Sequence, residues 1–166
     1  MAECKNIMVY VETAEGNPVK VGLEMLSPAK KLADKVTAVV IGGGVADAAK
    51  EVAKAGADQV ICVDSEDYKE FNLDAYAQVL VELVKEENPE AVFVGGTQDG
   101  KDIAPVVAAK CNTGCASDVL DIKAEDGEVI YTCPLYGGTV LEDVKIKTTP
   151  QIATLRSGAF QKVEDP

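Results

Sequence analysis

Five cysteines and a complete lack of histidine limit the chemistry that this sequence could support. Without histidine the chain can form no Ser-His-Asp triad, no Cys-His pair and no histidine-based zinc site. Cys111 and Cys115 are separated by three residues rather than two, and no matching pair stands elsewhere, so a metal site or redox-active dithiol is not indicated. We therefore expect no catalytic residues and no bound metal.

Two glycine-rich segments each follow an apolar run of strand length. In IGGGVAD (residues 41–47), Asp47 stands where a dinucleotide-binding fingerprint needs its last glycine, which favours a plain strand-to-helix turn over a phosphate site. The segment GGTQDGKD (95–102) matches G-x-x-x-x-G-K, but Asp102 replaces the hydroxyl residue that would bind Mg²⁺. Asp99 adds a further negative charge, so nucleotide hydrolysis is not expected. Helix capping by Asp99 or Asp102 and contact with a ligand or partner both remain open.

A third segment, TCPLYGGT (132–139), interrupts two strand-like runs with a proline, an aromatic residue and two glycines. A hairpin connection explains this composition. Paired glycines also allow a flat ligand or a partner to approach the backbone closely, so the segment is equally a candidate contact surface.

Charge and hydropathy exclude several classes of partner. The net charge of −12 repels phosphate backbones and anionic membrane surfaces, so nucleic acid is not an expected partner. No apolar run approaches the ~20 residues needed to span a bilayer, so membrane insertion is not expected, and the first residues lack a secretory signal pattern. An odd number of cysteines without an export signal indicates reduced thiols and a cytoplasmic protein.

Apolar periodicity predicts alternating strands and helices over the first two thirds of the chain. Strands are expected at residues 5–11, 36–41, 59–63 and 91–94, and helices at 17–35, 45–55, 73–87 and 101–111. Pro28 should kink or split the first helix. This alternation is typical of a single three-layer, doubly wound α/β domain with a mostly parallel sheet.

The last third is expected to differ, because no helix separates the strand-like runs at 118–123, 128–133, 139–147 and 151–156. Short links cannot make parallel crossovers, so these strands should pair antiparallel and extend one edge of the sheet at its C-terminal end.

Five segments together resemble one family. They are GLEML, VFVGGTQDGKDIAPVVAAK, TGCASDV, YTCPLYGG and IATLRSGAF. In this order and spacing they resemble the amino-terminal domain of the electron transfer flavoprotein alpha subunit, which reads GGT-x-x-GRDLAPRLAA, TG-x-x-SDV, RP-x-x-GGN and T-x-RPGAF at the corresponding places. The resemblance covers nearly the whole chain and implies an adenine nucleotide alpha hydrolase-like fold.

The resemblance implies a heterodimer in which this domain is a scaffold that packs on a beta subunit. FAD carries electrons from acyl-CoA or other flavin dehydrogenases, and the protein orients and tunes the flavin. The alpha subunit's FAD-binding domain would begin after about residue 160 and is expected to be missing from 1–166, so this chain should not retain FAD alone.

The family motifs also assign site residues by resemblance. The residues expected on the side of a flavin held by the beta subunit are Cys133, Pro134, Tyr136, Gly137, Gly138 and Thr139. The residues expected at the partner interface are Gly95, Gly96, Thr97, Lys101, Asp102 and Arg156. Cys133 stands where bifurcating relatives place an arginine close to the second flavin, which argues against bifurcation in this chain.

Departures from the family pattern leave an alternative open. Lys101 replaces an arginine and loses its planar bidentate fork, while Val106 replaces another arginine and keeps nothing polar. The alternative is a stand-alone adenine-nucleotide-binding module resembling universal stress proteins, which use a glycine-rich phosphate loop after the fourth strand.

Overall fold

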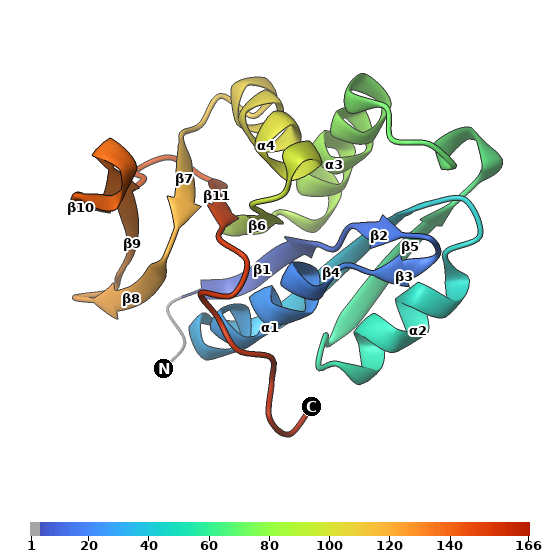
Figure 1. Cartoon of the computed structure of the whole chain (residues 1–166), viewed down its shortest axis with the longest axis horizontal. Helices are drawn as coiled ribbons and strands as arrows, with labels where there is room; N and C mark the ends of the chain where they lie inside the picture. Colours follow the sequence, from blue (N-terminus) through green and yellow to red (C-terminus); the bar gives the residue numbers. More distant parts are fainter. Residues whose placement is uncertain (1–3) are drawn as a thin grey trace.

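The computed structural model describes residues 4–166 and shows one central sheet between two layers of helices (Figure 1). The sheet has six parallel strands in the order β5-β4-β1-β6-β11-β7. Its strands are β1 (Cys4–Tyr10), β4 (Ala33–Gly42), β5 (Gln59–Asp64), β6 (Ala91–Gly95), β7 (Cys115–Val119) and β11 (Gln151–Leu155). The three-layer α/β fold predicted from the sequence is confirmed.

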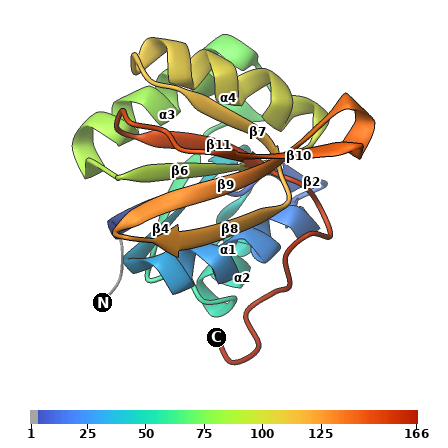
Figure 2. The same ribbon diagram turned by 90° about the vertical axis from the view of Figure 1, so that its left-hand side faces the viewer.

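Four helices cover the two faces of this sheet. They are α1 (Lys20–Leu32), α2 (Ala46–Lys54), α3 (Leu73–Glu87) and α4 (Gln98–Lys110). One core joins α1 and α2 to their face of the sheet and the other joins α3 and α4 to the opposite face (Figure 2). Buried on both faces, β6 is a continuous apolar run from Ala91 to Val94, as parallel strands require.

The first helix begins later than its periodicity predicts. Residues 17 and 18 form the short strand β3 (Asn17–Pro18), which pairs with β2 (Thr13–Ala14), and α1 starts only at Lys20. Pro28 lies inside α1, which continues to Leu32, so the helix is not split at this proline, while the kink that was the other expectation stays a prediction.

The last third of the chain makes a separate antiparallel sheet of β8 (Asp121–Glu125), β9 (Glu128–Leu135) and β10 (Val140–Val144). A short 3-10 helix (Tyr136–Gly138) connects the last two strands. The inner side of β9 is buried in the same core as α1, with Tyr131 packed edge-on against Phe93 at a centroid distance of 6.4 Å.

One expected strand pairing is wrong. We predicted that residues 151–156 pair antiparallel, but β11 lies parallel between β6 and β7. The physical reason is that the whole antiparallel sheet serves as the long crossover between β7 and β11, so no short link has to reverse direction.

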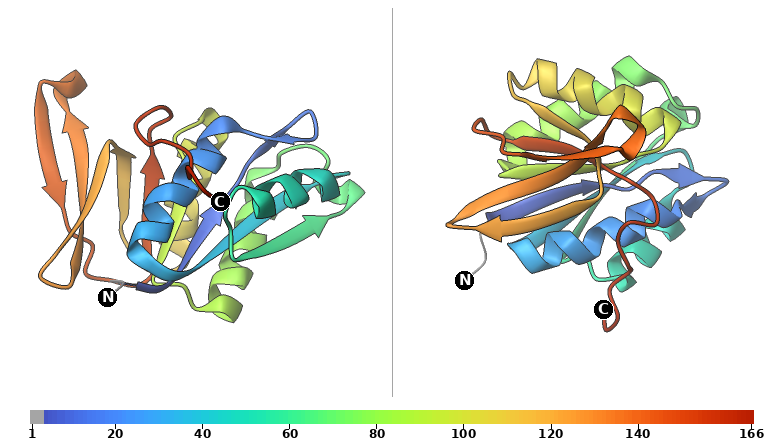
Figure 3. Two further views of the ribbon diagram at one scale, coloured as in Figure 1. Left: turned by 90° about the horizontal axis from the view of Figure 1, so that it is seen from below. Right: turned by 60° about the vertical axis from the view of Figure 1, so that its left-hand side comes forward.

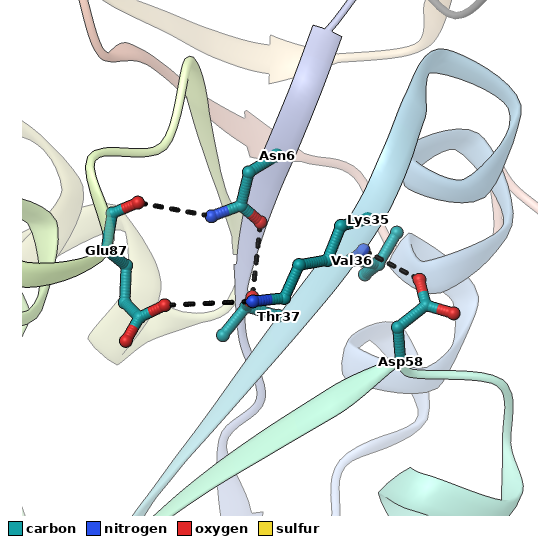
Figure 4. A network of polar contacts seen from close by, with 6 residues as sticks. All are labelled: Asn6, Lys35, Val36, Thr37, Asp58 and Glu87. Carbon is teal, nitrogen blue, oxygen red and sulfur yellow. Dashed lines mark hydrogen bonds and ion pairs between the residues drawn. The ribbon is translucent and has the colours of Figure 1, made fainter.

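A polar network fastens the amino-terminal ends of the central strands (Figure 4). The Asn6 amide donates to the Glu87 carbonyl at 3.4 Å and its Oδ1 accepts from the buried Thr37 hydroxyl at 3.1 Å. On the neighbouring strand, the Val36 N–H donates to Asp58 Oδ2 at 2.8 Å. The polar groups at the amino-terminal ends of these strands are bonded within the domain. We therefore look for a site at the opposite, carboxyl ends of the strands.

Candidate functional site

The candidate site lies at the carboxyl ends of the central strands, where the strand order reverses. The chain proceeds from β1 to β4 and β5 on one side and continues with β6 on the other, so the reversal falls between β1 and β6. Open α/β sheets bind ligands outside the carboxyl ends of strands at such a point. The residues that follow β1 and β6 are therefore the first to consider.

A half-buried carboxylate, Glu12, occupies this switch point. It follows β1 and accepts a hydrogen bond from the Thr97 hydroxyl, with 2.6 Å and 2.7 Å between Thr97 Oγ1 and the two carboxylate oxygens. The same Thr97 oxygen accepts the Gly100 N–H at 3.0 Å and so caps α4. The capping expected from Asp99 or Asp102 is thus made by Thr97, and Asp99 instead lies in the first turn, where the helix dipole favours it.

The electrostatics of the switch point disfavour a second anion. Burial raises the pKa of Glu12 above its usual range, and the charge of Asp99 adds to that rise, while bonds from Thr97 and Gly100 lower it in part. Burial likewise raises the pKa of the neighbouring Tyr10, helped by the charge of Glu12. Both pKa shifts indicate that a negative charge at this site is poorly solvated.

Replacing Glu12 by Gln should flatten the pH dependence of stability. The folded state holds the Glu12 proton more tightly than the unfolded chain, so stability falls as pH rises from the usual Glu pKa through the raised one. Chemical denaturation of Glu12→Gln between pH 4 and 8 should show a shallower fall than the wild type. The exposed control Glu15→Gln should keep the wild-type slope, and an unchanged slope in Glu12→Gln would contradict this assignment.

The cleft beside Glu12 does not suit a phosphate group. It encloses about 390 Å³ between the ends of β1 and β4, and its lining includes Tyr10, Tyr76, Glu12, Asp99 and a lysine, Lys69. The first glycine-rich turn lines it too, but the Gly44 N–H already donates to Asp64 Oδ1 at 2.7 Å. With three carboxylates, the third from Glu15, against one ammonium, the cleft repels a nucleotide diphosphate.

The second glycine-rich turn serves close packing between backbones. The Gly96 N–H donates to the Leu155 carbonyl at 2.8 Å, and a Cβ on Gly96 would lie 3.0 Å from that oxygen. A Cβ on Gly100 would lie 1.8 Å from the Gly95 carbonyl oxygen. The similarity of this segment to a phosphate loop therefore reflects how tightly α4 joins β6 and β11. Lys101 and Asp102 are exposed on the first turns of α4.

Arg156 is held by a carboxylate of its own domain. Its Nε donates to Asp118 Oδ1 at 2.8 Å and a terminal guanidinium nitrogen to Oδ2 at 2.5 Å, a bidentate pair. Asp118 has a positive φ of 59° at a register shift between β7 and β11, and its N–H donates to the Thr154 hydroxyl at 2.8 Å. Arg156 thus pairs with Asp118 at the carboxyl ends of β11 and β7. A role for Arg156 at a subunit interface stays a prediction.

The residues predicted on the flavin side divide into two groups. Cys133 is buried, and this burial raises the pKa of its thiol, with the negative charges of Glu142 and Asp118 adding to the rise. The others lie at or near the tip of the β9–β10 hairpin (residues 128–144), with Pro134 half-buried and the remainder exposed: Tyr136, Gly137, Gly138 and Thr139. Figure 2 shows this tip on the same side as the carboxyl ends of β7 and β11.

Within residues 4–166, which the structure describes, no three His, Cys, Asp or Glu side chains gather where they could hold a metal ion. None of its helices is long and apolar enough to cross a membrane.

Fold and site together define an α/β domain of the doubly wound class that has an acidic switch point, a tightly packed glycine turn and a projecting hairpin. A family model, the electron transfer flavoprotein domain, matches residues 7–166, and the chain belongs to this family.

Relatives agree with this assignment. The chain is 36% identical over 169 residues to the electron transfer flavoprotein subunit alpha of Clostridium acetobutylicum, covering 98% of this chain and 50% of that protein. It is 38% identical over 153 residues to the subunit alpha of Syntrophomonas wolfei, covering 92% and 48%. It is also 32% identical to the acryloyl-CoA reductase electron transfer subunit beta of Anaerotignum propionicum, covering 96% and 52%. The chain thus spans about half the length of the curated relatives it matches.

Proposed function

We propose that this chain is the amino-terminal scaffold domain of an electron transfer flavoprotein alpha subunit, which pairs with a beta subunit in FAD-mediated electron transfer from flavin dehydrogenases. The chain contributes no catalytic residue of its own. FAD supplies the redox chemistry when it is bound in the whole assembly, and this domain contributes a rigid docking surface.

The observation that carries the proposal is where the exposed apolar side chains lie. The large hydrophobic side chains exposed in residues 4–166 all belong to the β9–β10 hairpin: Leu135, Tyr136, Val140 and Leu141. Apolar groups gathered on one projecting element indicate contact with another protein. The cleft beside Glu12, by contrast, is acidic and does not fit the diphosphate of FAD, so we infer that the flavin is held by other parts of the assembly.

A stand-alone nucleotide-binding module is the second candidate. The fold and the position of the cleft favour it, but Glu12 and Asp99 in the lining oppose it. The proposal therefore rests on family membership and the hairpin rather than on the cleft.

One pair of measurements separates these functions. The purified chain is mixed with the electron transfer flavoprotein beta subunit of the same genome and the mixture is analysed by sedimentation velocity, and the chain alone is titrated with AMP, ATP and FAD by calorimetry. We expect a one-to-one complex and no saturable binding by the chain alone. Micromolar binding of AMP or ATP without complex formation would replace the proposal with the nucleotide module.

A further inference from the structure

The β9–β10 hairpin stands away from the body of the domain (Figures 1 and 3). Near its base, Tyr131 and Cys133 are buried against the core. Farther along the same face, Leu135 and its cross-strand partner Val140 are 39% and 46% exposed. An apolar stripe therefore continues from the core onto the exposed surface. Exposing it to water is unfavourable in free energy unless another surface covers it.

The two edges of the antiparallel sheet differ in a way that matters for pairing. On β8, charged residues alternate along the strand as Asp121, Lys123 and Glu125, a pattern that discourages a further strand. On β10, Leu141 is 60% exposed beside Val140. Within residues 4–166, β10 pairs with β9 and with no second strand, so the backbone along its outer side is available.

A carboxylate without a partner stands at the centre of this open edge. Cross-strand ion pairs join Lys123 to Asp143 at 3.4 Å and Lys145 to Glu128 at 2.6 Å. No hydrogen bond or ion pair from residues 4–166 reaches the carboxylate of Glu142, a residue that lies opposite the buried Cys133 in the β9–β10 register. A basic side chain on an added strand would neutralise it.

The same carboxylate argues against a second copy of this chain as the occupant. In an antiparallel pairing of two β10 strands about their centres, each Glu142 would face the other and each Leu141 would face Asp143. Like charges directly opposite each other destabilise a strand pair, and each copy adds a net charge of −12. The edge therefore favours a different protein with complementary charge.

We propose that β10 is a strand-addition site at which an extended segment of the beta subunit pairs edge to edge, setting apolar residues against Val140 and Leu141 and a Lys or Arg beside Glu142. This inference rests on the proposed function, since it takes the beta subunit as the partner. Backbone pairing supplies affinity in such contacts and the side chains select the partner.

The hairpin tip supplies an anchor beside the strand. Tyr136 is 84% exposed and has a positive φ of 51°, a conformation that is unfavourable for a tyrosine. Exposed tyrosines are frequent anchors in interfaces. A five-residue strand alone covers less than the roughly 1,200 Å² of a stable interface, so strand pairing would set the register of a larger contact.

Edge variants with matched controls test the inference. Leu141→Lys introduces a charge on β10, and its control Ala124→Lys introduces the same charge on β8. Glu142→Lys reverses a charge on β10, and its control Glu125→Lys reverses one on β8. All four positions are exposed, so thermal unfolding should stay near wild type. Calorimetry with the purified beta subunit should show binding weakened about 10-fold or more by the two β10 variants and less than about 2-fold by the two β8 variants.

Hydrogen exchange provides an independent measurement on the wild-type chain. Adding the beta subunit should slow amide exchange in residues 140–144 and leave residues 121–125 unchanged. If the wild type binds but β10 variants bind equally well and residues 140–144 gain no protection, the strand-addition site is wrong while the proposed function stands. If the wild type does not bind the beta subunit, both fail. A homodimer abolished by Leu141→Lys would overturn the choice of partner.

Discussion

Gly100→Ala should destabilise the domain more than any other single-methyl change in it, by about 3 kcal/mol or more. The added Cβ would lie 1.8 Å from the Gly95 carbonyl oxygen and 3.1 Å from Thr97 Oγ1. Both neighbours belong to the turn that joins β6 to α4: the nearer is a backbone atom, and Thr97 Oγ1 is held by its bonds to Glu12 and Gly100. Relief would require α4 to move away from β6, which would break the bond from the Gly100 N–H to Thr97. Urea denaturation measures the loss.

The matched control is Gly114→Ala. A Cβ on Gly114 would meet only Ile146 Cγ2 at 3.6 Å, an ordinary contact, and this residue is exposed. Its stability should change by no more than about 0.5 kcal/mol. Since helix propensity alone would make Ala at position 100 slightly stabilising, equal stability of the two variants would show that the β6–α4 turn adapts and is not closely packed.

The alternation of strands and helices was predictable because parallel strands buried on both faces are apolar runs. Val92, Phe93 and Val94 are each at most 1% exposed, and a short apolar run bounded by turn residues is typical of such a strand. The helix expected at residues 73–87 has these bounds in the structure, where the Asn72 side chain caps its start and Asn88 ends it in the left-handed conformation.

The position of β11 was not predictable from local pattern. Its residues read as a strand, but whether a strand pairs parallel depends on which neighbours the chain has left open. The expected strand at 118–123 is divided at Leu120, because β7 ends at Val119 and β8 begins at Asp121 in a second sheet. Nothing in the local sequence distinguishes this passage from one sheet to another from a single continuous strand.

The sequence indicated which segments form the candidate site, but not which residues their side chains contact. Thr97 and Arg156 were expected at an interface, whereas the structure first shows their partners within the domain, Glu12 and Asp118. The acidic residue that holds the C-terminal segment, Glu24, was missed, although a carboxylate on the apolar side of an amphipathic helix is itself a signal of a buried bond.

Glu24→Ala should release the C-terminal segment (residues 156–166) from α1. Glu24 is 3% exposed, and its Oε2 accepts the Gly158 N–H at 2.9 Å across 134 residues of sequence. Beyond this bond, Phe160 and Val163 pack against the α1 side of the core. Losing a buried, charge-assisted acceptor should cost about 2 kcal/mol, and hydrogen exchange of residues 157–163 should quicken roughly 10-fold or more.

Two controls separate this bond from the charge of Glu24. Glu24→Gln keeps an oxygen acceptor and should hold the segment nearly as well as the wild type. Lys20→Ala removes the ion-pair partner at 3.3 Å, but the Lys20 side chain is 72% exposed, so little stability should be lost. Slow exchange in all three variants would show that Phe160 and Val163 alone hold the segment. If only Glu24→Ala releases it, a single carboxylate on α1 fixes the path of the chain after Arg156.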